Sequence, residues 1–166
     1  MRATLTSPTR PPMASIPTRS PSEGDNHASL WAVADDAECT PDGTFGQLYA
    51  AHSHDQGLAE GELAWLTQLT ENPAYRTNIS LTNTGTSQAN VMVTLFDGDG
   101  TELASYELWL GPGVWKQANQ AFLNRATQTD ISAGYARVEV ITGDGVVASA
   151  SVVNNTTNDP TTIPAT

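Results

Sequence analysis

The sequence predicts an all-β fold, an antiparallel, immunoglobulin-like β-sandwich that follows a disordered N-terminal segment. Short segments alternate apolar and polar residues, as strands do when one sheet face is buried and the other faces water. Glycine-containing turns separate these segments at roughly the 8–12-residue spacing typical of sandwiches. The composition agrees, because 39% of the residues are hydrophobic and only 15% are charged. A chain rich in Thr, Asn, Ser and Gly favours strands and turns over long helices.

Five segments show the period-two alternation: Thr77–Thr82, Val91–Leu95, Ala104–Leu110, Ala136–Val140 and Val147–Val152. Successive side chains of a strand point to opposite faces, so each segment has an inward and an outward set. The residues expected to face the core are Ile79, Leu81, Val91, Val93, Leu95, Tyr106, Leu108, Leu110, Ala136, Val138, Val140, Ala148, Ala150 and Val152. Those expected to face solvent include Ser80, Thr82, Met92, Thr94, Ser105, Glu107, Trp109, Arg137, Glu139, Ser149 and Ser151.

Turn sequences lie between the predicted strands. Asp97–Gly100 and Gly143–Gly145 contain Asp-Gly pairs, which are hairpin signals because glycine adopts positive φ at little cost. Asn83–Gly85 and Gly111–Gly113 mark further turns. One short helical turn is expected at Gln117–Arg125. The side chains expected to point inward from it are Ala118, Phe122 and Leu123.

The N-terminal part differs from the rest of the chain. Residues 1–27 mix proline with Ser, Thr and Arg, and such a segment buries too little apolar surface to offset its ordering entropy. We expect it to be disordered, and residues 28–164 to form the sandwich domain. A loose similarity between Ala32–Thr44 and Ser151–Ile163, about one domain length apart, suggests tandem modules. Residues 28–42 are therefore predicted to be the last strand of a preceding repeat.

The charge is strongly negative and unevenly distributed. The formal net charge is −11. Arg2, Arg10 and Arg19 lie in an N-terminal stretch without acids, so residues 20–166 hold four basic and 18 acidic side chains, a net charge of −14. Such a body repels phosphate backbones and anionic membrane surfaces, which argues against nucleic acid and membrane partners. No apolar run long enough for a membrane helix occurs, and residues 1–22 lack the apolar stretch of a signal peptide.

A histidine pair is the most suggestive cluster for chemistry. In a strand, His52 and His54 would share a face and could coordinate one metal ion, with Asp55 or His27 as a third ligand. Partners at metal-site spacing are absent elsewhere in the sequence. Cys39 is the single cysteine, which excludes an intrachain disulfide and a cysteine-based zinc cluster. An exposed polar loop explains the pair better than a metal site does.

Asp97 and Asp99 resemble the start of a calcium loop. A full loop also needs a third acid and a closing glutamate, and both are missing here. A hairpin turn explains the two acids, so they stay weak metal candidates. We expect no catalytic site and no cofactor, because the sequence has no nucleophile-elbow motif and no glycine-rich phosphate loop. Ser53 is unsuited to a triad, since adjacent residues of a strand point to opposite faces.

The four tryptophans would form a carbohydrate platform if some of them were exposed. Trp31, Trp65, Trp109 and Trp115 are more simply explained as residues that fill or rim the core. Trp109 is the exception, because the alternation of its segment turns it away from the core. It is therefore the weak candidate for ligand binding or for packing against a neighbouring module.

Several short motifs occur in a recognisable order. They are Gly43–Gln47, Ala74–Ile79, Leu81–Gly85, Val93–Asp97, Gly134–Val138, Ala150–Asn155 and Asp159–Thr161. In residues 28–164 the chain thereby resembles the β-sandwich repeat modules at the C-termini of large secreted bacterial proteins. The resemblance implies an extracellular or cell-surface location and no shared catalytic residues.

Together these features predict a non-catalytic module of a bacterial secreted protein. Its expected role is structural, adhesive or that of a spacer between other domains, and neighbouring domains or other proteins are its expected partners. The alternative is an accessory module that binds carbohydrate or calcium, which the tryptophans and the acidic turns suggest. The sequence alone sets neither the ligand nor the oligomeric state.

Overall fold

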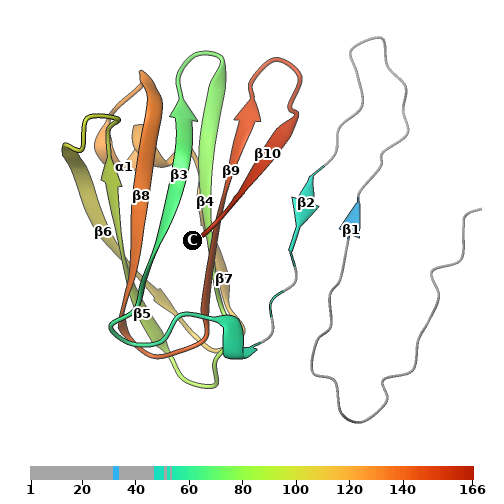
Figure 1. Cartoon of the computed structure of the whole chain (residues 1–166), viewed down its shortest axis with the longest axis vertical. Helices are drawn as coiled ribbons and strands as arrows, with labels where there is room; N and C mark the ends of the chain where they lie inside the picture. The colour runs from blue at the N-terminus through green and yellow to red at the C-terminus, as the bar shows by residue number, and fades with distance from the viewer. Residues whose placement is uncertain (1–31, 34–46, 51, 53) are drawn as a thin grey trace, which may run out of the picture.

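The computed structural model describes residues 32–33, 47–50, 52 and 54–166, and it has the predicted all-β, immunoglobulin-like sandwich fold (Figure 1). Two antiparallel four-stranded sheets form the sandwich. Sheet I has the strand order β10-β9-β4-β7, and sheet II has the order β3-β8-β5-β6. The strands of sheet I are β4 (Tyr75–Asn83), β7 (Trp115–Ala118), β9 (Val146–Asn154) and β10 (Pro160–Pro164). The strands of sheet II are β3 (Leu63–Glu71), β5 (Ala89–Phe96), β6 (Glu102–Leu110) and β8 (Ile131–Thr142).

The hydrophobic core lies between the sheets and confirms the predicted alternation. Ile79 and Leu81 of β4 are buried in one cluster with Val91, Val93 and Leu95 of β5. The predicted inward residues Leu110, Ala136, Val138, Val140, Ala148 and Ala150 belong to the same buried cluster, and Tyr106, Leu108 and Val152 pack against it partly buried. The period-two pattern therefore identified which face of each strand is inside.

One outward residue is nevertheless buried. Thr94 is only 1% exposed, whereas the alternation predicted it to face solvent. Its strand, β5, is an inner strand of sheet II, where Thr94 pairs with Arg137 on one side and Ser105 on the other. The Ser105 hydroxyl lies within hydrogen-bonding distance of the Thr94 hydroxyl, with 2.9 Å between the oxygens. Thr94 is thus shielded from water between its two outward-facing neighbours, Arg137 and the hydrogen-bonded Ser105.

The turns connect the strands differently from what the glycine signals suggested. Asp97–Gly100 forms the predicted hairpin, since it joins the paired strands β5 and β6 of sheet II. Gly143–Gly145 does not form a hairpin, because it leads from β8 in sheet II to β9 in sheet I. Gly143 adopts a φ of +95°, and a Cβ there would come within 2.8 Å of Ala89, so this crossover requires glycine. Local sequence marks a reversal of the chain but does not show which sheet comes next.

The alternation did not reveal the sandwich strands β3, β7 and β10. In β3 the period is broken by a β-bulge, with register shifts after Leu66 and a φ of +59° at Gln68. β7 includes Gln117 and Ala118, the first two residues of the expected helical turn, and the helix α1 spans only Ala121–Ala126. Phe122 of α1 is buried as predicted, whereas Leu123 is 37% exposed and was wrongly placed inside.

The N-terminal predictions lie mostly outside the described residues, including all of 1–27. Within 28–42, the described residues Ala32–Val33 form β1, which pairs with β2 (Leu48–Tyr49) beside β10 (Figure 1). A short 3₁₀ helix, η1 (His54–Gln56), then leads into the sandwich. In the described part of the chain, no helix has the length and hydropathy needed to span a membrane.

Candidate functional site

The two predicted histidine ligands lie at the entry to the sandwich and not in a strand. His52 precedes η1 and lines a groove on sheet I, whereas His54 is the first residue of η1. The segment is therefore not a strand at this point, so the expected sharing of one face has no basis. Among the described residues, no group of three His, Cys, Asp or Glu side chains is arranged to hold a metal ion. His27 and Cys39 lie outside the described residues.

The acids of the β5–β6 hairpin serve the turn itself. The Asp97 carboxylate accepts hydrogen bonds from the backbone N–H groups of Asp99, at 3.0 Å, and Thr101, at 2.8 Å. The bond from Thr101 is the main reason that the pKa of Asp97 is lowered. This arrangement is an Asx-type turn, in which the side chain mimics a backbone acceptor. It accounts for Asp97 without any bound calcium.

Trp109 lies on the outer face of sheet II, as predicted, and is 51% exposed. The same face carries an aromatic cluster formed by Trp65, Phe96 and Tyr135. The rings of Phe96 and Tyr135 stack at 4.8 Å, and Trp65 tilts against both at 6.1 and 5.8 Å. Trp65 therefore packs on the outer surface of its own sheet. Trp109 takes part in no such ring contact within the described residues.

The more exposed tryptophan is Trp115, which the sequence did not single out. It opens strand β7 at the edge of sheet I and is 58% exposed. Its register partner is Thr82, and Gln117 pairs with Ser80, so these four residues share the outer face. Trp115 and Gln117 face outward and Ala118 is buried, but four residues are too few to show a period. In addition, Gln117 and Ala118 were assigned to a helical turn.

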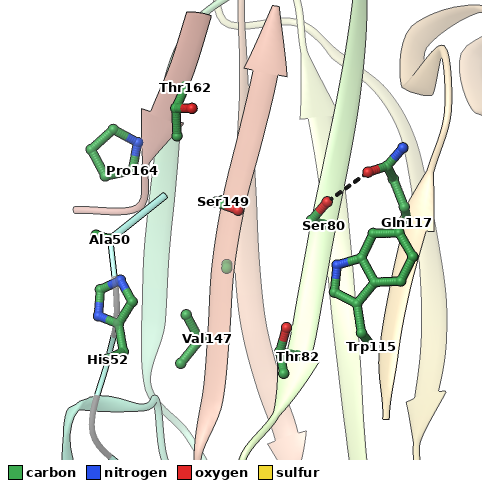
Figure 2. A pocket seen from close by; sticks show the side chains of 11 residues that line it. Ala50, His52, Ser80, Thr82, Trp115, Gln117, Val147, Ser149, Thr162 and Pro164 are labelled. Atoms are coloured by element: carbon green, nitrogen blue, oxygen red, sulfur yellow. Dashed lines mark hydrogen bonds between the residues drawn. The ribbon is translucent and has the colours of Figure 1, made fainter. Parts of the chain in front are cut away.

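A groove of about 260 Å³ crosses the outer face of sheet I next to Trp115. Its floor is made by Val147 and Ser149 of β9 and by Ser80 and Thr82 of β4, which pair directly as Ser80–Ser149 and Thr82–Val147. In Figure 2, His52 lies on one side of this floor and Trp115 on the other. Thr162 and Pro164 of β10 and Ala50 complete the wall on the His52 side.

The polar groups of the groove are only partly used within the protein. Ser80 donates a hydrogen bond to Gln117 Oε1 at 3.0 Å, and Gln117 in turn donates to Asn119. Within the described residues, no hydrogen bond involves the hydroxyl of Thr82 or Ser149, and the Thr162 hydroxyl is buried without a partner. The groove thus offers free hydroxyl groups that act both as donors and as acceptors.

The groove on the outer face of sheet I is lined by no Asp, Glu, Lys or Arg. The four strands of sheet I contain no Asp or Glu, and their two cationic residues, Arg76 and Lys116, do not line the groove. His52 is the single titratable group of the lining. Sheet II, by contrast, carries four glutamates in its strands. In a chain with a net charge of −11, this distribution leaves a polar groove without acidic side chains.

No protein-family model and no curated protein matches this sequence. The fold is similar to that of the crystal structure of Thermotoga maritima 1070, with a TM-score of 0.51 and 14% sequence identity. The similarity covers 66% of this chain and 96% of the Thermotoga chain. At this identity it shows the shared fold alone.

A second hollow, of about 320 Å³, lies at one end of the sandwich and contains a buried carboxylate. Glu71 is 4% exposed and accepts backbone hydrogen bonds from Leu123 at 2.7 Å and from Phe122 and Thr77 at 3.3 Å. Burial raises the pKa of Glu71, and these three hydrogen bonds oppose the rise. Because Gln120 provides no side-chain cap for α1, Glu71 takes over that role from a distant strand. This carboxylate therefore docks the helix and is not free for chemistry.

The helix is also held at its other end. The Arg125 guanidinium lies 4.7 Å from the ring centroid of Tyr106, a cation–π contact. Burial raises the pKa of Tyr106 to about 12, so the phenol stays protonated at neutral pH. Sequence reasoning placed Tyr106 inside but did not find its partner, since the two residues belong to different elements.

Arg76 ties two turns of the sandwich together. Arg76 donates hydrogen bonds to the side chains of Asn155 at 2.9 Å and Asn158 at 3.1 Å. The Asn155 backbone donates to the carbonyl of Ala74 at 2.8 Å. These contacts link the β3–β4 turn to the β9–β10 turn, so this part of the motif set is structural.

Proposed function

We propose that this chain is a non-catalytic extracellular module with an adhesive role. In this proposal the sandwich is a rigid support that presents the outer face of sheet I to a partner surface. The observation that supports this proposal is the groove on that face. There Trp115 is 58% exposed beside the hydroxyl groups of Thr82 and Ser149, which form no hydrogen bond within the described residues. A hollow that combines apolar surface with a few convergent polar groups is the usual form of a ligand site.

The rigidity of the support favours binding. The inner strands β4 and β9 of sheet I each pair on both sides, so the floor of the groove is fixed by backbone hydrogen bonds. The Arg76 contacts lock the turns at one end of these strands. Side chains held in place before binding lose little conformational entropy when a ligand arrives. A spacer would need the same rigidity but no groove.

The location outside a bacterial cell rests on the resemblance of residues 28–164 to modules of secreted bacterial proteins. The acidic body supports it weakly, since a strongly negative surface keeps an exported module soluble and disfavours contact with nucleic acid. Accessibility of the native protein to a protease added outside intact cells tests this part. Full protection in intact cells, with cleavage after lysis, would contradict it.

The adhesive role is tested by retention of the full chain on surfaces. A fluorescent fusion is incubated with washed bacterial cells and with insoluble cell-wall polymers, and the bound fraction is measured. We expect retention that falls in Trp115→Ala and is unchanged in Trp109→Ala, which is a matched exposed tryptophan on the other sheet. Equal retention of the two variants would remove the groove from the proposal, and no retention would favour a spacer. Release of soluble fragments from a retained polymer would contradict the non-catalytic part.

A further inference from the structure

We infer that the groove on the outer face of sheet I binds a neutral oligosaccharide, with Trp115 as the stacking platform. The inference rests on the proposed adhesive function and names the chemical class of its ligand. It depends on three properties of the groove, which are its charge, the exposure of the indole ring and the arrangement of hydroxyl groups around it.

The charge of the groove selects against ionic ligands. A phosphorylated or carboxylated ligand needs a cationic partner, and no Lys or Arg lines the groove. A cationic ligand would be attracted instead to the acidic side chains of sheet II and the loops, since the strands of sheet I contain no Asp or Glu. Ionic groups buried without partners are strongly penalised. The ligand that fits this face is therefore polar and uncharged.

The indole ring of Trp115 offers a flat apolar surface. The ring is 58% exposed and takes part in no aromatic contact within the described residues, unlike Trp65. The faces of aromatic rings carry partial negative charge, which attracts the polarised C–H groups on one face of a sugar ring. A wholly polar ligand such as urea or glycerol has no comparable flat C–H face. A ligand with one apolar face and a polar rim matches the site better.

The polar groups near the ring match sugar hydroxyls. Thr82 is the register partner of Trp115, and Ser149 lies across Ser80 on the neighbouring strand. Hydroxyl side chains donate and accept at once, as sugar hydroxyls do, so either partner can fill either role. The Gln117 amide and the His52 ring add polar groups at opposite sides of the floor (Figure 2). Neutral hydrogen bonds of this kind give orientation without requiring charge.

The size and openness of the groove favour a short chain that lies across the strands. A volume of about 260 Å³ is just below the range of roughly 300–1,000 Å³ for sites that enclose drug-sized ligands. The floor extends from β10 across β9 and β4 to β7, which is about 14 Å at ordinary strand spacing. A small oligosaccharide can lie along this direction with one ring on Trp115 and its ends in solvent.

The binding test uses isothermal titration calorimetry of the full chain with neutral oligosaccharides. The panel contains β-1,4-linked glucose, xylose, mannose and N-acetylglucosamine oligomers, together with β-1,3- and α-1,4-linked glucose oligomers. Oligogalacturonate, which is anionic, is the charge control. We expect at least one neutral oligomer to bind, oligogalacturonate not to bind, and binding to quench or shift the tryptophan fluorescence.

Variants then locate the site. We expect Trp115→Ala to weaken binding by about tenfold or more, because stacked aromatic rings dominate such contacts. Thr82→Val should weaken it by a smaller factor, and Trp109→Ala should leave it unchanged. Circular dichroism melts confirm that each variant folds. Because Trp115 is mostly exposed, Trp115→Ala is expected to melt near the wild type, and Trp115→Phe serves as a second variant that keeps a ring.

The outcomes distinguish failure of the oligosaccharide inference from failure of the proposed adhesive function. Absence of binding across the neutral panel, or equal binding by wild type and Trp115→Ala, would overturn the oligosaccharide inference. If the chain is still retained on cells after periodate has oxidised surface sugars, the adhesive function stands with a non-carbohydrate partner. If retention is lost after periodate and is competed by the bound oligomer, both proposals are supported.

Discussion

The aromatic cluster on the outer face of sheet II and Trp115 on the outer face of sheet I differ in their surroundings. On sheet II, Trp65, Phe96 and Tyr135 contact one another and leave each ring half-buried. On sheet I, Trp115 stands at the edge of a groove whose other residues are small and mostly polar. The strands of sheet II also carry four glutamates, whereas those of sheet I carry no acidic residue.

This difference shows that exposure of an aromatic residue says little until its neighbours are known. A ring that stacks on other rings stabilises the fold, because burying its faces recovers hydrophobic and dispersion energy within the protein. A ring without such partners leaves that energy available to a ligand. The contrast predicts that substitutions in the aromatic cluster of sheet II affect mainly stability, and that substitution of Trp115 on sheet I affects mainly binding.

The largest expected difference is between Phe96→Ala and Trp115→Ala. Phe96 contacts both other rings of the aromatic cluster, so its removal should lower the free energy of unfolding by about 2 kcal/mol. Trp115→Ala should cost less than about 0.5 kcal/mol, as exposed substitutions generally do. Urea denaturation of both variants measures the two costs. Equal costs would break the comparison between the faces.

A matched pair of threonines sharpens the comparison. Thr94 and Thr82 both lie on inner strands and face outward, but Thr94 is 1% exposed and Thr82 lines the groove. Replacing either by Ala loses β propensity to a similar extent, so the difference between them reports burial. We expect Thr94→Ala to cost about 1 kcal/mol more than Thr82→Ala in chemical denaturation. The reverse order would show that the outer face of sheet I is the better packed one.

The pH dependence of stability should come from carboxylates of sheet II and its hairpin, with opposite signs. The pKa of Glu71 is raised on folding by burial, so the folded state binds more protons and the Glu71 contribution falls as pH rises from the ordinary glutamate pKa through the raised one. The pKa of Asp97 is lowered mainly by the Thr101 hydrogen bond. The Asp97 contribution is therefore present above the ordinary aspartate pKa and is lost as pH falls through the lowered value.

Melting curves of Glu71→Gln and Asp97→Asn over the acidic pH range measure these contributions. The wild-type-minus-variant difference in stability should fall with rising pH for Glu71→Gln and rise for Asp97→Asn. The Asp97 effect is expected to be the smaller, because its carboxylate lies in a surface turn whereas that of Glu71 is buried. Slopes of the same sign for both variants would contradict the opposing roles assigned to burial and hydrogen bonding.

The smallest expected effect is that of salt on binding. A neutral ligand in an uncharged groove forms no ion pairs, so the dissociation constant should change by less than about twofold between low ionic strength and molar salt. Calorimetry in sodium chloride of increasing concentration checks this. A steep salt dependence would move the site from sheet I to a charged surface.

Much of the fold was predictable from local sequence, and the candidate site was not. The alternation in Val91–Leu95 placed Val93 inside, and that in Ala104–Leu110 turned Trp109 outward, as the structure confirms. The β-bulge at Gln68 hid strand β3, since one added residue reverses the faces that follow it. Trp115 was missed because β7 has only four residues, too few to show a period.

The sequence by itself determined which side chains of the longer strands are buried, because strand alternation depends only on neighbouring residues. Tertiary structure decided which strands share a sheet and therefore which outward residues meet. It sent Gly143–Gly145 across to the other sheet, brought Glu71 to the start of α1, and set Thr82 beside Trp115. Such contacts join residues far apart in the chain, and the free energy that selects them comes from packing the whole core.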